Sequence, residues 1–179
     1  MMIGGYIKLF FGFIAISVIL YLPISFILKK KGIGFITTLS YLLCFWSFFI
    51  VIFTTIILFN LPFRLEPERS ILNFQPLSWL WEGDIEQRLL SEIVPNIMIF
   101  IPLGFFIPIV FNRMRKFFKT ALVIFFVTLS IEFFQYFIGR SSDIDDLFAN
   151  LLGGIIGYGL FKVLKFYVLR YKLLKKTCR

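Results

Sequence analysis

The sequence predicts an all-α membrane protein, a bundle of about five transmembrane helices forming one membrane domain over residues 1–179. The first observation is compositional: 59% of the residues are hydrophobic and 20% are aromatic, and one soluble core of this length cannot bury that much apolar surface. The second is that the apolar residues fall into runs close to the ~20 residues that cross a bilayer. The third is an asymmetric distribution of basic residues, which predicts how the bundle is oriented.

Five apolar segments are long enough to be membrane spans, or come close. We expect spans at residues 9–28, 33–61, 94–111, 118–138 and 147–169, with a loop over residues 62–93. The first is longer than the ~7–15-residue apolar core of a cleavable signal, so we interpret it as a retained span. The third is short and contains Pro95, Pro102 and Pro108, which leaves its ends poorly defined.

Basic residues cluster after the first, third and fifth expected spans, whereas nine of the ten acidic residues lie in the two loops on the other side. Because excess Lys and Arg mark the cytoplasmic face, we expect the N-terminus outside and the C-terminus in the cytoplasm. Both acidic loops would then face outward. The net charge of +9 fits contact with anionic membrane lipids, and no basic and aromatic patch for nucleic acid is visible.

The residue types also restrict the chemistry. The chain has no histidine, which removes His-based nucleophile activation and the common His-based metal sites. Cys44 and Cys178 have no metal-ligand spacing and cannot form a framework of disulfides. No cofactor is therefore predicted, although a divalent cation held by carboxylates stays open, as does the oligomeric state.

The loop before the third span contains apolar and indole side chains that suit a short helix lying in the membrane interface. These residues are Leu77, Trp79, Leu80, Trp81, Ile85 and Leu89, and Gly83 interrupts them.

Glu132 is the most informative polar residue, because a carboxylate within a span is tolerated only where it faces protein or water. Gln135 lies on the same helical face and Thr128 lies one turn deeper, so the three form one polar stripe. A structural ion pair between Glu132 and Arg140, or hydrogen bonds to Gln135 or Asn96, would also explain the carboxylate.

The segment "RSSDIDD" contributes a second set of polar groups. Asp143, Asp146 and Asn150 share one face if the fifth helix has begun by Asp143, whereas Asp145 points to another face. Helix capping accounts for some of these acids but does not call for all of them. With Asn96 at the outer start of the third span, the polar residues are expected to converge on one outward-facing pocket.

Two longer stretches then resemble the VanZ-like family of bacterial membrane proteins: "NIMIFIPLGFFIP" (residues 96–108) and "IEFFQYFIGRSSDIDDLFANLLGGIIGYG" (residues 131–159). "NFQPL" (residues 73–77) is similar to a further family segment, so the resemblance covers about residues 73–159. The positions that match the family pattern are Asn96, Pro102, Gly104, Glu132, Gln135, Arg140, Asp143, Asp146, Asn150 and Gly153.

The resemblance implies a multi-pass protein of the bacterial cytoplasmic membrane. The family's named member is associated with resistance to teicoplanin-type glycopeptide antibiotics, which act outside the membrane on a lipid-linked envelope precursor. The leading hypothesis is a pocket that binds such a lipid-linked precursor, a phospholipid headgroup or a lipoglycopeptide. Arg140 would pair with a phosphate or carboxylate, while Asn96, Gln135 and Asn150 would hydrogen-bond sugar or amide groups.

Two alternatives stay open. In a membrane hydrolase or transferase, Glu132 would be the general acid or base, and Asp143 and Asp146 would activate water or, with Glu132, hold a divalent cation. In a proton-coupled transporter, Glu132 would relay protons, although no partner residue continues a path to the inner half of the membrane.

Overall fold

The computed structural model describes residues 2–58, 72–73, 75–77, 80, 85–138 and 142–177. Within these ranges the chain is almost entirely helical, which confirms the predicted all-α class. The elements are α1 (Met2–Lys30), α2 (Phe35–Ile52), η1 (Phe53–Leu58), β1 (Leu72–Asn73), α3 (Ile85–Arg88), η4 (Leu89–Ile93), α4 (Val94–Val110), η5 (Asn112–Met114), α5 (Phe117–Phe137), β2 (Ser142–Asp143) and α6 (Ile144–Thr177).

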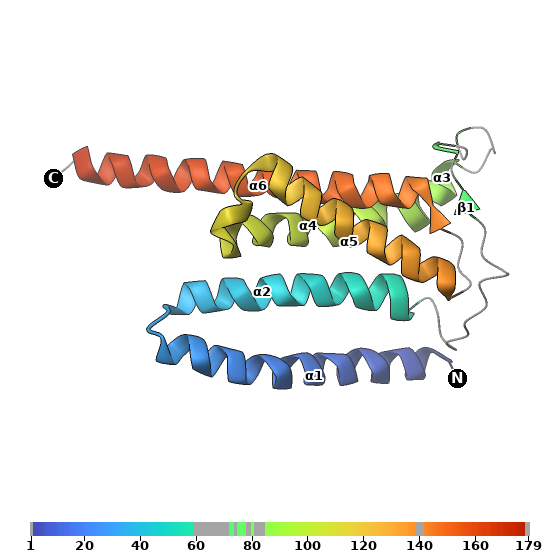
Figure 1. The fold of residues 1–179 in the computed structure, drawn as a ribbon, viewed down its shortest axis with the longest axis horizontal. Coiled ribbons are helices and arrows are strands. Elements are labelled where there is room, and N and C mark those ends of the chain that lie inside the picture. Colours follow the sequence, from blue (N-terminus) through green and yellow to red (C-terminus); the bar gives the residue numbers. More distant parts are fainter. Residues whose placement is uncertain are drawn as a thin grey trace.

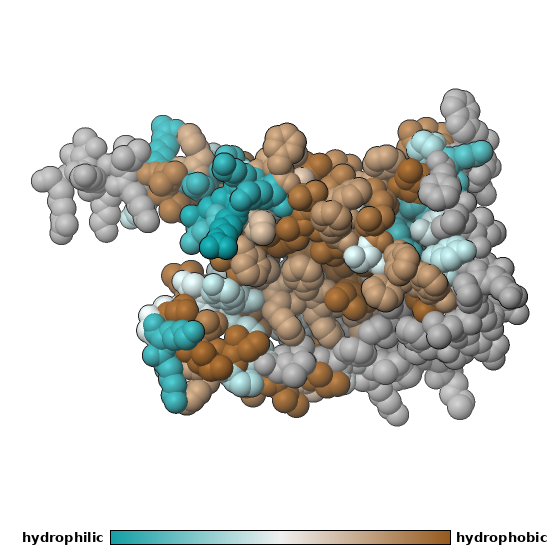
Figure 2. All heavy atoms as spheres, in the orientation of Figure 1, coloured by the Kyte–Doolittle hydropathy of each residue, from teal (hydrophilic) through white to brown (hydrophobic). Residues whose placement is uncertain are grey.

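Four helical runs within the described ranges are long and apolar enough to cross a membrane: Phe35–Thr55, Ile85–Val110, Phe117–Phe137 and Ile144–Tyr171. Helix α1 precedes them and forms a hairpin with α2, while α4, α5 and α6 form a second group beside this hairpin (Figure 1). The two chain ends lie at opposite ends of the bundle. In the face drawn in Figure 2, apolar side chains cover the middle and hydrophilic ones gather toward the two ends. A bilayer requires this distribution, because its core offers no water to polar groups.

The helices that correspond to the third and fifth expected spans, α3–α4 and α6, extend well beyond the predicted bounds. The third begins at Ile85 and runs through α3 and η4 into α4, so the loop ends before the expected residue 93. Its first turns carry polar residues that a search for apolar runs does not detect. The fifth begins at Ile144 and continues to Thr177. The predicted face shared with Asp146 and Asn150 had required Asp143 to be helical. Asp143 instead lies in β2, directly before α6.

Helices α4 and α6 pack so closely that three glycines at their crossing have no room for a side chain. A Cβ on Gly104 would overlap the Gly154 backbone, and a Cβ on Gly153 or Gly157 would overlap the backbone at Ile97 or Ile101. Small residues at a helix crossing allow this approach in membranes. Pro102 lies on the exposed side of α4, which remains helical from Val94 to Val110.

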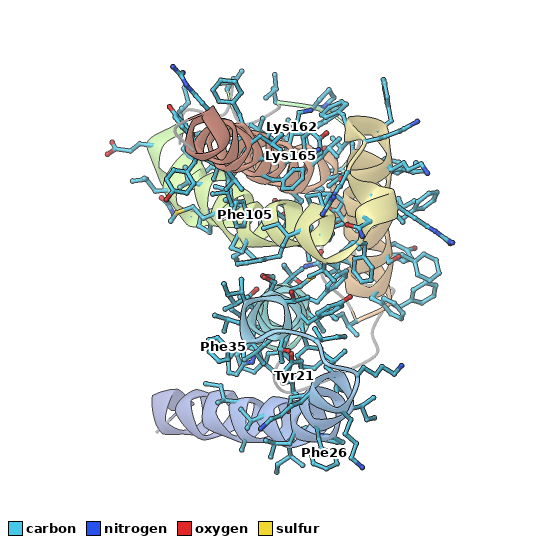
Figure 3. The ribbon with its side chains drawn as sticks, turned by 90° about the vertical axis from the view of Figure 1, so that its left-hand side faces the viewer. Tyr21, Phe26, Phe35, Phe105, Lys162 and Lys165 are labelled. Carbon is cyan, nitrogen blue, oxygen red and sulfur yellow. The ribbon has the colours of Figure 1, made fainter. Side chains whose placement is uncertain are left out.

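Figure 3 shows the bundle from the end that lies on the left in Figure 1. Lys162 and Lys165 lie on α6, while Tyr21 lies between α1 and α2. The Tyr21 hydroxyl donates to the Thr38 carbonyl at 2.6 Å and so joins the two helices of the hairpin.

The two short strands tie the loop to the turn before α6. They pair in parallel, with Leu72 opposite Ser142 and Asn73 opposite Asp143. This pairing brings the start of the "NFQPL" segment beside the polar turn, although each paired residue lies 70 positions from its partner in the chain. The expected interfacial helix cannot be followed, because Trp79, Trp81 and Gly83 lie outside the described residues.

Candidate functional site

A polar cavity of about 370 Å³ lies among the helices at the end of the bundle that contains the strand pair. Its lining comes from η1, from η4 and α4, and from α5 and α6. Five residues singled out in the sequence line it: Asn96, Glu132, Gln135, Asp146 and Asn150. The convergence expected from hydropathy and helical spacing therefore occurs in the folded chain.

Glu132 is 6% exposed and its carboxylate points toward the start of β2. Its Oε2 accepts hydrogen bonds from the Ser142 hydroxyl at 2.9 Å and from the Asp143 backbone N–H at 3.3 Å. These donors partly offset the cost of burying a carboxylate. Arg140, the expected ion-pair partner, lies outside the described residues.

Gln135 joins α5 to η1 across the cavity. Its Nε2 donates to the Thr55 carbonyl at 2.9 Å, and the side chain is 2% exposed. A carbonyl oxygen can only accept, so the amide can make this bond in one orientation only. The Gln135 Oε1 is consequently left as a buried acceptor that has no hydrogen-bond partner among the described residues.

Asn150 makes a similar connection between α6 and α5. Its Nδ2 bonds the Thr128 hydroxyl at 2.8 Å, and both residues are almost fully buried. The Asn150 Oδ1 is a second buried acceptor without a partner in the described part of the chain. The expected polar stripe therefore exists, with Thr128 at its deep end.

Asp146 and Asn96 bring α6 and α4 together at the cavity wall. The Asn96 Nδ2 donates to Asp146 Oδ1 at 2.7 Å, and Asp146 is 8% exposed. Asn96 thus uses its donor group on a protein carboxylate. Both residues line the cavity, as does Glu92 at the end of η4.

Asp143 is held outside the cavity lining by three separate partners. Its Oδ2 accepts from Arg88 Nη2 and from Asn73 Nδ2, the latter at 3.2 Å. Its Oδ1 accepts from the Asp145 backbone N–H at 3.0 Å, which caps the first turn of α6. Because both oxygens have protein partners, Asp143 acts in this structure as an anchor for the loop and the helix.

Asp145 is 4% exposed and faces the loop, in a different direction from Asp146. Its two carboxylate oxygens accept from the Leu77 backbone N–H at 2.9 and 3.1 Å. Leu77 has a positive φ of 60°, a backbone conformation that is rare for a residue with a side chain. The carboxylate therefore holds the loop where its backbone is least favourable.

Sequence reasoning missed Arg88 and gave Asn73 and Ser142 no role at the site. Basic residues are rare between residues 62 and 93, and Arg88 is the nearest of them to the third expected span. The available signal was an arginine between Glu86 and Glu92, shortly before an apolar run. The contacts of Asn73 and Ser142 depend on the strand pairing, which no local pattern predicts.

The described lining of the cavity contains acidic side chains. It includes the carboxylates of Glu92, Glu132 and Asp146, and no Lys or Arg is found among its described residues. The binding of a divalent cation stays a prediction. Within the ranges that the structure describes, no three His, Cys, Asp or Glu side chains form a group that could hold a metal ion.

An apolar groove of about 670 Å³ lies between α2 and α5. Phe48 and Ile52 form one wall, and Val127 and Phe134 belong to the other. Ile131 lines both this groove and the polar cavity. The two hollows are therefore neighbours along α5.

Comparison with known proteins finds a match to the family described as VanZ/LLP1, over residues 39–165. The matched region includes most of the second span and extends on both sides of residues 73–159, where the sequence resemblance is concentrated. No curated protein and no solved structure matches the chain.

Proposed function

Because the chain belongs to the VanZ/LLP1 family, we propose that this multi-pass membrane protein binds an amphiphilic ligand of the bacterial cell envelope. The ligand is a lipid-linked envelope precursor, a phospholipid or a lipoglycopeptide antibiotic. Its binding contributes to resistance against teicoplanin-type glycopeptides.

The observation that carries the proposal is that the polar cavity and the apolar groove share the lining residue Ile131. An amphiphile needs a site of two characters, one for a polar head and one for a hydrocarbon tail. The cavity is lined by carboxylates and amides, whereas the groove is lined almost entirely by aliphatic and aromatic side chains. One molecule lying along α5 would place its head in the cavity and its tail in the groove.

The head supplies most of the selectivity. The tail moves from lipid into a groove of similar polarity, so it gains little from a hydrophobic effect. In the cavity, each buried acceptor without a partner costs about 1–3 kcal/mol, and a ligand or water molecule that donates to it recovers this energy. Gln135 and Asn150 each present one such acceptor.

The orientation is part of the proposal. Excess Lys and Arg at the opposite end of the bundle would place the cavity at the outer leaflet, with the N-terminus outside and the C-terminus in the cytoplasm. A lipid-linked precursor exposed outside the membrane could then enter laterally between α2 and α5. Arg140, next to the cavity in the sequence, would pair with a phosphate or carboxylate at the rim.

Alanine at Glu132 or Arg140 tests the cavity, and tryptophan at Val127 tests the groove by filling it. We expect all three variants to lower binding of the amphiphile and to raise susceptibility to teicoplanin in cells that depend on this protein. Val163→Trp is the matched control, because Val163 lies exposed on α6 and does not line the groove. Unchanged binding and susceptibility in well-expressed cavity variants would contradict the proposal.

A membrane hydrolase or transferase is the second candidate, favoured by the presence of Glu132 and Asp146 in the lining of one cavity. Glu132 would serve as the general acid or base and Asp146 would orient water or a cation. Asp143 is a poorer candidate for either part, because Arg88, Asn73 and the cap of α6 engage its oxygens. Purified protein incubated with a lipid-linked precursor and Mg²⁺ would form a product if this reading is correct, and Glu132→Gln would abolish it.

A further inference from the structure

The connection between α4 and α5 packs against α6 at the end of the bundle opposite the polar cavity. The Tyr158 hydroxyl of α6 donates to the Arg115 carbonyl at 2.9 Å, and the Tyr158 ring meets the Phe117 ring edge-on at 5.6 Å. Tyr158 itself is only 7% exposed. Two segments that lie 43 positions apart in the chain are therefore held side by side.

Basic side chains gather where these two segments meet. Lys162 and Lys165 lie one and two turns beyond Tyr158 on the same face of α6. Hydrophilic side chains gather over the α4–α5 connection in Figure 2, and the two lysines are labelled on α6 in Figure 3. The exposed residues that we call the basic patch are Arg113, Arg115, Lys116, Lys119, Lys162 and Lys165.

The segments that form the basic patch contain no acidic residue. All ten acidic residues of the chain lie between positions 66 and 92 or between positions 132 and 146. The ion pairs among the described residues do not involve the patch, and the Arg115 Nε donates to a neutral group, the Pro108 carbonyl, at 3.3 Å. An anion that approaches the patch is therefore attracted by cations from two segments.

The ends of two spans place the basic patch near the lipid headgroups. Helix α4 ends at Val110 and α5 begins at Phe117, so the connection lies where both helices leave the apolar layer. Phe111 and Phe118 flank the connection and are 50% and 82% exposed. Exposed aromatic rings beside basic groups suit a partner that has hydrocarbon tails as well as a negative head. Nucleic acid offers the charge without the tails.

We propose that the basic patch binds an anionic phospholipid, and that the α4–α5 connection and α6 each hold one phosphate when the headgroup carries two. The proposal goes beyond the proposed function, because the patch and the polar cavity lie at opposite ends of the bundle. The Arg115 guanidinium can pair with a phosphate through two N–H groups, and the lysines act as point charges. A headgroup with two phosphates engages both segments at once, so it is preferred over a headgroup with one.

A competition among three phospholipids with the same type of acyl chain tests the proposal. Cardiolipin has two phosphates, phosphatidylglycerol has one, and phosphatidylcholine has one that its own cation neutralises. The purified full chain is equilibrated with an equimolar mixture, and native mass spectrometry measures the bound lipids. We expect cardiolipin in roughly tenfold excess over phosphatidylglycerol, with phosphatidylcholine bound least. The excess should fall as the salt concentration rises.

Matched variants locate the preference in the basic patch. Lys116→Gln and Lys162→Gln remove one charge from each segment, and each should lower the cardiolipin excess because only one segment stays intact. Lys29→Gln and Lys31→Gln remove the same charge at exposed positions beside the α1–α2 turn, at the same end of the bundle. These two controls should keep the excess, as should Glu132→Gln in the polar cavity.

Three results would overturn the proposal. Equal binding of cardiolipin and phosphatidylglycerol would show that the two segments do not hold two phosphates together. Equal effects of the patch variants and the Lys29 and Lys31 controls would show that binding follows the net charge of the chain alone. Retention of a single-stranded oligonucleotide in place of lipid would assign the patch to nucleic acid. If a patch variant does not fold, the lipid preference of the unmodified chain still decides.

Discussion

Arg88 and Asp143 form an ion pair that joins α3 to the residue that caps α6. The two residues are separated by 55 positions, and neither lies in the apolar part of a span. Asn73 donates to the same Asp143 oxygen from the paired strand. One carboxylate thus holds together the loop, α3 and the start of α6 near the polar cavity.

Replacing Arg88 with methionine should destabilise the protein. The change leaves Asp143 with less than its full set of partners, and its side chain is only 12% exposed. We expect a loss of about 1–3 kcal/mol in the free energy of unfolding. Thermal unfolding in detergent, followed by circular dichroism, measures it.

Glu92→Gln is the control for this ion pair, because Glu92 also contacts Arg88 but is 48% exposed. An exposed pair of this kind contributes at most about 1 kcal/mol. Equal effects of the two substitutions would show that the Arg88–Asp143 pair contributes no more to the free energy of unfolding than the exposed Arg88–Glu92 pair does.

Alanine at Gly153 should disturb the crossing of α4 and α6. A Cβ there would overlap the backbone at Ile97, so the helices must separate, at a cost of about 1–3 kcal/mol. Gly159→Ala is the matched control on the same helix, because nothing lies within 4 Å of its added Cβ. We expect a lower unfolding midpoint for Gly153→Ala alone, and similar midpoints for the two variants would contradict the packing described here.

Removal of the Asp145 carboxylate should release the loop at Leu77. Both oxygens accept from the Leu77 N–H, which stays protected while they hold it. In Asp145→Ala we expect hydrogen exchange at Leu77 to become at least roughly tenfold faster, which corresponds to the loss of about 1.4 kcal/mol of local stability. Glu86→Ala should leave the exchange unchanged, and unaltered protection in Asp145→Ala would show that the loop is held by other contacts.

The predicted orientation is tested with single cysteines in a chain whose Cys44 and Cys178 are replaced by serine. Glu86→Cys lies near the cavity end of the bundle, and Lys116→Cys lies at the start of α5 near the opposite end. A membrane-impermeant maleimide should label Cys at position 86 in intact bacteria and Cys at position 116 only after lysis. The reverse pattern would place the cavity on the cytoplasmic side.

Much of the fold and part of the site follow from local patterns. Apolar runs predict the helices, and spacing by three and four residues predicts that Thr128, Glu132 and Gln135 share a face. The presence of Asn96 in the same cavity as the polar residues of α5 and α6 follows from the expected orientation of the spans, whereas its hydrogen bond to Asp146 was not predicted. These predictions succeed because membrane helices are long, regular and constrained to cross the same slab.

Other features depend on contacts between distant segments and could not be predicted. Asp143 lies opposite Asn73 because β1 pairs with β2 in parallel. No sequence periodicity predicts a pair of two-residue strands. The role of Asp145 depends on where Leu77 lies, and the groove depends on where α2 and α5 lie relative to each other. The early start of the third helix is masked by the polar residues of its first turns.

The central claim is that one amphiphile occupies the cavity and the groove together. It is tested most directly with a photoreactive phosphatidylethanolamine that carries a diazirine in its acyl chain, incubated with the full chain in lipid nanodiscs and mapped by mass spectrometry after illumination. We predict labels concentrated on the groove residues around Phe48 and Val127, and fewer labels there in Glu132→Gln, where the head is held less tightly. Labels spread evenly over the exposed faces, including Phe166 and Tyr167 of α6, and unchanged in Glu132→Gln, would contradict the claim.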